Sequence, residues 1–119
     1  MPDQSKRARG RWGEDRAAAH LRRAGYVIVH RNWRSSERDV RGEIDIVARD
    51  GRVLVLCEVK ARRTSGFGGA AVAVDCAKQE QIRRLAASWL RTVDERCDGV
   101  RFDVVAIDGV RLTHYAAAF

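Results

Sequence analysis

The chain has 119 residues, enough for one domain that buries about two-thirds of the surface of its unfolded chain. Its 23 lysines and arginines outnumber its 16 acidic residues and leave a formal charge of +7, which favours a polyanionic partner, most often nucleic acid. No apolar run approaches the roughly 20 residues that cross a bilayer, and the basic N-terminus lacks the apolar stretch of a signal peptide. We therefore expect a cytoplasmic protein with no membrane partner.

The N-terminal part of the chain predicts an arm followed by a helix. Residues 1–9 are expected to form a flexible basic arm, and residues 10–119 a single domain. A helix is predicted from Gly10 to Ala24, because Gly25 is the residue favoured just after a helix ends. Glu14 falls on the apolar stripe of this helix. Two interpretations of Glu14 stay open: it favours the positive end of the helix dipole, or it points into the acidic patch described below.

The next segment predicts a strand and a basic loop. Tyr26 to Arg31 is β-branched and aromatic, which is typical of a strand. Asn32 to Arg41 is rich in arginine and contains Trp33. An aromatic side chain among basic residues suits contact with phosphate and an unstacked base, so Trp33 and Arg34 are candidate nucleic-acid contacts. The alternative is that Trp33 anchors the loop to the core.

Residues 42–60 read as a β-hairpin with acidic side chains. Its two strands are joined at Asp50-Gly51, a dipeptide favoured in two-residue type I′ turns. If the residues on either side of this dipeptide close the hairpin, Glu43 faces Glu58, and Asp45 lies diagonal to Glu58. Side chains alternate between the two faces along a strand. The three acids are therefore expected on one face of the sheet.

Lys60 shares that face, so three acids and one lysine converge on a single patch. Like charges across a strand pair destabilise a sheet, and buried charges are costly unless they are paired or bound to a metal. One lysine neutralises only one carboxylate. A divalent cation would neutralise the others, and oxygen ligands suit Mg²⁺ or Mn²⁺ better than zinc. The alternative is a solvent-facing hairpin surface with an ordinary ion pair.

A basic and glycine-rich segment follows the hairpin. Arg62 and Arg63 come soon after Lys60 and are candidate contacts to a nucleic-acid backbone. Thr64 to Gly69 carries three glycines in its last four positions, which predicts a loop that either is mobile or approaches a partner closely. Next to the acidic patch, it is a candidate to close over a phosphate backbone. The segment lacks the pattern of a nucleotide-binding P-loop, so ATP binding is disfavoured.

The C-terminal half predicts a second helix and two strands. Asp75 is a good N-cap for a helix that runs to about Val93. Five residues make its core stripe at helical spacing: Ile82, Leu85, Ala86, Trp89 and Val93. Lys78 continues this stripe near the helix start, where it either reaches a phosphate or is simply solvated. Residues 101–107 are apolar enough for a strand covered on both faces, and residues 110–115 form the last strand.

The predicted order is helix, three strands, helix, two strands, which indicates an α/β fold with a mixed sheet flanked by helices. The first three strands are expected to form a meander. The chain has three cysteines with no CxxC pair and no zinc pattern with its histidines, so reduced and mostly buried thiols are predicted.

Asp45, twelve intervening residues and then Glu58-Val59-Lys60 resemble the motif of the PD-(D/E)xK nucleases. The surrounding sequence is similar to the bacterial YraN family (UPF0102), small proteins with a restriction-endonuclease-like fold, over about Gly10 to Ile107. The segments that carry this resemblance are Gly13-Glu14, Arg31-Asn32-Trp33-Arg34, Gly42-Glu43-Ile44-Asp45, Glu58-Val59-Lys60, Phe67-Gly68 and Lys78. Ile44 stands where the nuclease motif usually has a proline.

The family in turn resembles archaeal Holliday-junction resolvases, which use a glutamate of the first helix with the Asp and Glu-x-Lys set. That resemblance implies a catalytic set of Glu14, Asp45, Glu58 and Lys60, with the three carboxylates holding Mg²⁺ or Mn²⁺. It implies a metal-dependent nuclease, with DNA and in particular branched DNA as candidate substrate, and it is compatible with a homodimer. Two other classes stay open: a non-catalytic nucleic-acid-binding module that keeps the fold, and a protein-interaction domain.

Overall fold

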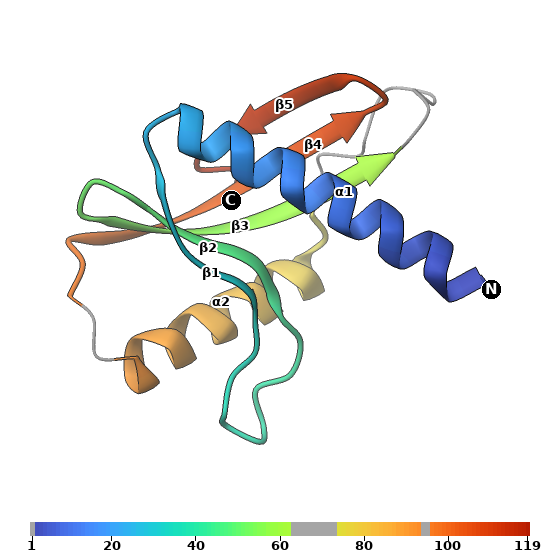
Figure 1. Ribbon diagram of the computed structural model, residues 1–119. Helices are drawn as coiled ribbons and strands as arrows, with labels where there is room; N and C mark the ends of the chain where they lie inside the picture. The colour runs from blue at the N-terminus through green and yellow to red at the C-terminus, as the bar shows by residue number, and fades with distance from the viewer. Residues whose placement is uncertain (1, 63–73, 94–95) are drawn as a thin grey trace.

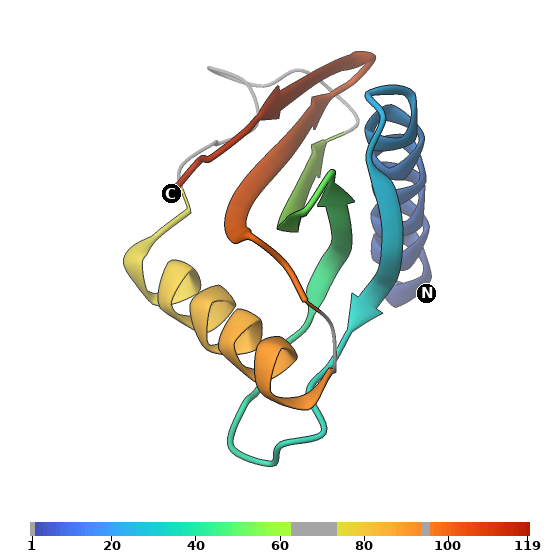
Figure 2. The same cartoon turned by 90° about the vertical axis from the view of Figure 1, so that its left-hand side faces the viewer.

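The computed structural model describes residues 2–62, 74–93 and 96–119 (Figure 1). Its elements follow the chain as α1 (Pro2–Arg23), β1 (Val27–Trp33), β2 (Ile44–Asp50), β3 (Val53–Arg62), α2 (Cys76–Thr92), β4 (Gly99–Asp108) and β5 (Arg111–Tyr115). The strands form one mixed sheet in the order β1 to β5, and the two helices lie against opposite faces of it (Figure 2). This confirms the predicted α/β class and element order, and it is compatible with a restriction-endonuclease-like fold.

The sheet is built from a meander and one crossover. β1, β2 and β3 are successive antiparallel neighbours, as predicted. The chain then crosses over through α2 so that β4 runs parallel to β3, and β5 returns antiparallel to β4. No helix in the described ranges is both long and apolar enough to cross a membrane.

Helix α1 ends as predicted but begins earlier than expected. Gly25 adopts a left-handed conformation with φ +94, and the N–H groups of Gly25 and Tyr26 bond to carbonyls of the last helical turn at 3.0 and 2.9 Å. This pair of bonds is the Schellman arrangement that closes many helices. The start is at Pro2 rather than near Gly10, because proline is well suited to the first helical position. Residues 2–9 therefore continue the helix instead of forming the predicted arm.

The turn between β2 and β3 corrects the predicted register. Gly51-Arg52 forms the two-residue loop, rather than Asp50-Gly51. Glycine stands at the first loop position with φ +60, as in a type II′ turn, whereas the predicted type I′ turn requires positive φ at both positions. The pairing is shifted by two residues, so Glu43 does not face Glu58. Continuing the observed ladder by one pair instead places Asp45 opposite Glu58.

The shift by an even number of residues keeps the residues of the β2–β3 ladder on their predicted faces. Both faces of the central strands are buried, which explains their near-continuous apolar sequence. On one face, α1 covers them through Ala17, Ala18 and Leu21.

On the opposite face, α2 contributes the predicted stripe of Ile82, Leu85, Ala86 and Trp89, with Val93 packed at its end. Asp75 caps this helix through a 2.8 Å bond from the Lys78 N–H.

The cysteines only partly match the prediction. All three thiols are free, as expected. Cys57 is buried in the core and Cys97 is half-buried, but Cys76 is exposed at the start of α2. The expectation of mostly buried thiols is therefore wrong for Cys76.

Candidate functional site

The candidate site lies where β2 and β3 part from each other. The observed β2–β3 ladder ends at the pair Ile46 and Cys57, whereas β3 continues as Glu58–Arg62 paired with β4 on its other side. Beyond this last pair, β2 and β3 are no longer paired with each other. Side chains from the start of β2, from β3 and from both helices can therefore meet at this end of the sheet.

Asp45 and Glu58 are the centre of this site. The Asp45 carboxylate accepts a hydrogen bond of 2.8 Å from the Val59 N–H, which holds it against β3. Burial, then the charge of Glu58 and more weakly that of Glu14, raise the pKa of Asp45 to about 7, against the opposing effect of the Val59 bond. Burial also raises the pKa of Glu58, with added repulsion from Glu14 and Glu43. Two acids thus share a site that disfavours their being charged together.

Two lysines partly offset this repulsion. The Lys78 Nζ lies 3.9 Å from a carboxylate oxygen of Glu58, reaching down from the first turn of α2. Lys78 and Lys60 both lower the pKa of Glu58, although burial outweighs them. The structure therefore places Lys78 beside the acids, where the sequence indicated only a phosphate contact or a solvated side chain.

Glu14 reaches the site from α1. The helix packs closely on the extension of β3, since a Cβ at Gly13 would lie 2.6 Å from the Cβ of Ala61. The next residue, Glu14, accepts a 3.1 Å hydrogen bond from the Asn32 side chain and lies 3.6 Å from the guanidinium of Arg31. Its charge raises the pKa of Asp45, which favours the interpretation that Glu14 faces the acidic patch.

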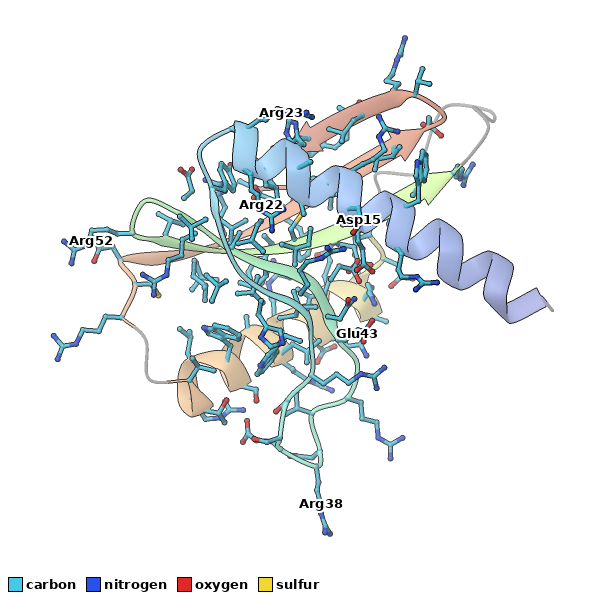
Figure 3. All side chains as sticks on the ribbon, in the orientation of Figure 1. Asp15, Arg22, Arg23, Arg38, Glu43 and Arg52 are labelled. Atoms are coloured by element: carbon cyan, nitrogen blue, oxygen red, sulfur yellow. The ribbon has the colours of Figure 1, made fainter. Side chains whose placement is uncertain are left out.

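Glu43 completes the acidic side of the site. Its carboxylate lies 3.1 Å from Nε of Arg34, and it faces a pocket of about 440 Å³. The pocket, which we call the α1 pocket, is lined by Gly10, Arg11, Glu14, Asn32 and Glu43. Figure 3 shows Glu43 and Asp15 at this side of the molecule, between α1 and the start of β2. The α1 pocket is thus an open space next to the acids, with Glu14 and Glu43 in its lining.

One of the predicted nucleic-acid contacts, Trp33, is not accessible to a ligand. Trp33 is buried in the α2 core, where its ring meets that of Trp89 edge to face at 5.1 Å. It therefore anchors the strand end, and stacking on a base is excluded in this conformation. Arg34 is exposed and paired with Glu43, and Arg62 is exposed at the end of β3. Arg63 and the glycine-rich loop Thr64 to Gly69 lie outside the described residues.

Asn32 is the site residue that sequence reasoning missed. It lies inside β1, next to the core residue Trp33, with φ 54, a left-handed conformation that asparagine tolerates better than most residues. In this conformation its side-chain amide donates to Glu14. The signal in the sequence was weak: an asparagine directly after the predicted strand Tyr26 to Arg31, a residue type depleted in strands.

The oxygen donors of Asp45 and Glu58 fit a hard divalent cation. Mg²⁺ is usually bound through one or two carboxylates, with waters and substrate phosphates completing its shell. The raised pKa of both acids indicates that the pair lacks sufficient positive charge from the chain itself. Within the described ranges, no group of three or more His, Cys, Asp or Glu side chains is arranged to hold a metal. Asp45 and Glu58 are therefore the two carboxylates that the structure brings together for such a cation, and the role of Glu14 as a further metal ligand stays a prediction.

Comparisons with known proteins agree with the sequence resemblance. The model of a family described as the uncharacterised protein family UPF0102 matches residues 13–107. A UPF0102 protein of Frankia alni is 46% identical over 124 residues, covering 100% of both chains. One from Rhodococcus jostii is 51% identical over 100 residues, covering 84% of this chain and 81% of its own. One from Geobacter sulfurreducens is 46% identical over 112 residues, covering 90% and 84%.

Proposed function

Since the chain belongs to the UPF0102 family, whose description assigns no activity, we propose its function from the site itself: metal-dependent hydrolysis of nucleic-acid phosphodiester bonds. The observation that carries this proposal is the buried pair of Asp45 and Glu58, flanked by two lysines. Buried acids whose pKa values are perturbed by burial and by specific charged neighbours are candidate catalytic groups. The net charge of +7 supports a polyanionic substrate.

The residues take distinct roles in this proposal. Asp45 and Glu58 hold Mg²⁺ or Mn²⁺, with Glu14 as a predicted further ligand. The bound cation supplies polarisation of a phosphoryl oxygen and a more acidic water. Lys60 orients the attacking water and stabilises the negative charge that develops on the phosphoryl oxygens. Lys78 lowers the pKa of Glu58 against the larger effect of burial, which favours cation binding over protonation.

A cleavage panel tests the proposal. Labelled single strands, duplexes, flaps, four-way junctions and RNA are incubated with the protein in Mg²⁺, Mn²⁺ or EDTA. We expect cleavage of at least one substrate only with metal, and a loss of at least about 100-fold in Asp45→Asn, Glu58→Gln and Lys60→Ala. Asp98→Asn serves as the control. Asp98 is an exposed acid whose carboxylate lies 3.1 Å from Nε of Arg52, and this pair stands at the end of β3 that is opposite the candidate site. Cleavage that survives both Asp45→Asn and Lys60→Ala would overturn the assignment.

A non-catalytic nucleic-acid-binding module is the second candidate. It is favoured by one observation: the net charge of +7 supports binding of nucleic acid whether or not the protein cleaves it. This class predicts salt-sensitive binding to nucleic acid, no cleavage in any metal, and carboxylate variants that bind as well as the wild-type protein. If a four-way junction is the preferred ligand, a homodimer is expected, which light scattering after size-exclusion chromatography measures.

A further inference from the structure

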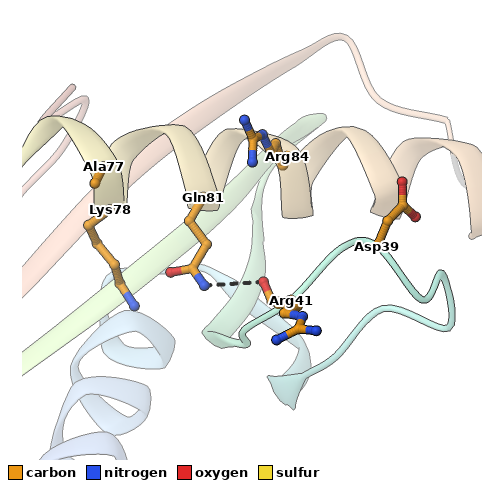
Figure 4. A pocket seen from close by; sticks show the side chains of 6 residues that line it. All are labelled: Asp39, Arg41, Ala77, Lys78, Gln81 and Arg84. Atoms are coloured by element: carbon orange, nitrogen blue, oxygen red, sulfur yellow. Dashed lines mark hydrogen bonds between the residues drawn. The ribbon is translucent and has the colours of Figure 1, made fainter.

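A second pocket lies on α2, next to the acidic site and separate from the α1 pocket. This α2 pocket has a volume of about 430 Å³ and is lined by Asp39, Arg41, Ala77, Lys78, Gln81 and Arg84 (Figure 4). Three cationic side chains face it and only one carboxylate. Its volume falls in the range of pockets that hold small ligands. Because three cations and one carboxylate line the pocket, an anionic ligand is favoured.

The α2 pocket is built by a specific contact between the helix and the loop before β2. Gln81 reaches from α2 and donates a 3.2 Å hydrogen bond to the carbonyl oxygen of Arg41 (Figure 4). The next residue, Gly42, has φ +96, and a Cβ at this position would lie 2.4 Å from the Gln81 side chain. The loop needs glycine here because of this positive φ, since the flexible end of Gln81 can move aside from an added Cβ. The Gln81 bond holds the Arg41 backbone against α2, the helix that also carries Lys78 and Arg84.

Lys78 joins the α2 pocket to the acidic site. It lines the pocket, and its ammonium lies 3.9 Å from Glu58. An anion in the pocket and a phosphate at the acids would therefore share one cation. In a single nucleic-acid strand, successive phosphates stand side by side along the backbone. The acidic site and the α2 pocket are thus neighbours that meet at Lys78, as contacts to two successive phosphates require.

We propose that the α2 pocket binds the backbone phosphate next to the reacting phosphodiester, with Arg41 and Arg84 as its ligands and Lys78 between the two sites. Guanidinium groups suit this role because their planar fork matches phosphate oxygens. Arg84 forms a 2.7 Å ion pair with Glu80 in which both side chains are exposed. An exposed ion pair contributes little to stability, so a phosphate can replace Glu80 as the partner of Arg84 at little cost. Asp39 is the one lining group that repels the phosphate. The identity of the ligand rests on the proposed function, but its binding does not require catalysis.

The test measures the salt dependence of binding in EDTA, where no cleavage occurs. Fluorescence anisotropy gives the Kd of a labelled four-way junction and of a labelled single strand across a series of NaCl concentrations. For Arg41→Gln/Arg84→Gln we expect affinity to fall about 10-fold and the slope of log K against log salt to shrink by about 1 to 2, since each lost phosphate contact contributes about one unit. Asp39→Asn is expected to bind more tightly than the wild-type protein.

The matched control is Arg22→Gln/Arg23→Gln, which removes the same charge from the exposed end of α1, far from the pocket (Figure 3). Its slope should stay within experimental error of the wild-type slope, and circular dichroism should show all variants folded. The proposal is overturned if the pocket variant keeps the wild-type slope, if the control loses as much, or if the wild-type protein binds neither ligand. Metal-dependent cleavage with an unchanged pocket slope would refute the pocket alone. A reduced slope without any cleavage would refute the proposed hydrolysis alone.

Discussion

Asp45 lies in an environment that is unfavourable to its own charge. In an unfolded chain an aspartate titrates near pH 3.9, whereas burial and Glu58 raise the pKa of Asp45 to about 7 in the fold. Between these values the folded protein binds more protons than the unfolded chain, so this group lowers stability as pH rises through that window. Below about pH 4 both states are protonated and the effect is absent.

Asp45→Asn should therefore stabilise the protein at neutral pH while removing its proposed metal site. The amide has no charge to bury, and its oxygen can still accept the bond from Val59. We expect a gain on the order of 2 kcal/mol in the free energy of unfolding at pH 8 and almost no change at pH 4. Urea denaturation at a series of pH values measures it. The control is Asp98→Asn, which replaces an exposed acid and should change stability by less than about 0.5 kcal/mol at every pH. A loss of stability in Asp45→Asn at pH 8 would contradict this account.

At the scale of elements, the contact between α1 and β3 determines where Glu14 stands. A methyl group at Gly13 would meet the Cβ of Ala61 at 2.6 Å, and neither group can rotate away. Gly13→Ala should therefore push the helix off the sheet and destabilise the fold by about 1 to 3 kcal/mol, despite the better helix propensity of alanine. Thermal unfolding measures this effect.

Gly10→Ala is the matched control for this prediction. Gly10 lies in the same helix with nothing within 4 Å of an added Cβ. This substitution should be neutral or stabilising by up to about 1 kcal/mol, because alanine is the better helix former. If both variants lose equal stability, the close packing of α1 on β3 is not the cause.

The elements whose boundaries depend on local chemistry were predictable from the sequence. Gly25 ends α1 and Asp75 caps α2 because each supplies the conformation or acceptor that a helix end needs. The start of α1 was not predictable, since residues 2–9 carry no apolar periodicity. The hairpin register was also missed, because a glycine after an aspartate fits either position of a two-residue loop, and Gly51 takes the first.

The candidate site was only partly predictable for a different reason. Its acids follow from strand alternation, which an even register shift leaves intact. The contacts of Glu14 with Asn32 and of Glu58 with Lys78 join residues 18 and 20 positions apart in sequence, on elements whose packing alone brings them together. Local sequence patterns do not encode such long-range contacts. The sequence therefore left the positions of Glu14 and Lys78 open.

At the scale of the whole molecule, a second charged network ties the sheet to α1. Asp103 is fully buried, and Arg101 binds both its oxygens at 2.8 Å while His114 binds one at 2.7 Å. His114 in turn contacts His20 of α1 at 3.1 Å, and Arg101 extends to Asp50 at 2.9 Å and to Tyr26. Although burial alone would raise the pKa of Asp103, these hydrogen bonds hold it well below its usual range.

Asp103→Asn should destabilise the protein by about 3 kcal/mol at pH 7, because it removes the buried carboxylate that binds Arg101 through both oxygens and leaves the partly buried guanidinium with only Asp50 as an acidic partner. The sign of the pH effect is opposite to that of Asp45. A lowered pKa stabilises the fold above the unfolded value near 3.9, and the contribution is lost as pH falls below it. The variant should therefore show a shallower loss of stability in acid, measured by urea denaturation. A change below about 0.5 kcal/mol would show that the network is not structural.

The hydrogen bond from the Val59 N–H to Asp45 gives the protein a built-in spectroscopic reporter. Because the acceptor is the carboxylate itself, the chemical shift of this one amide should follow the proton on Asp45, with a midpoint near pH 7. Mg²⁺ competes with that proton and should move the midpoint to lower pH, whether or not any substrate is turned over. In Asp45→Asn the resonance should stay still across the same titration. A backbone amide thus offers a direct readout of cation occupancy at the two carboxylates.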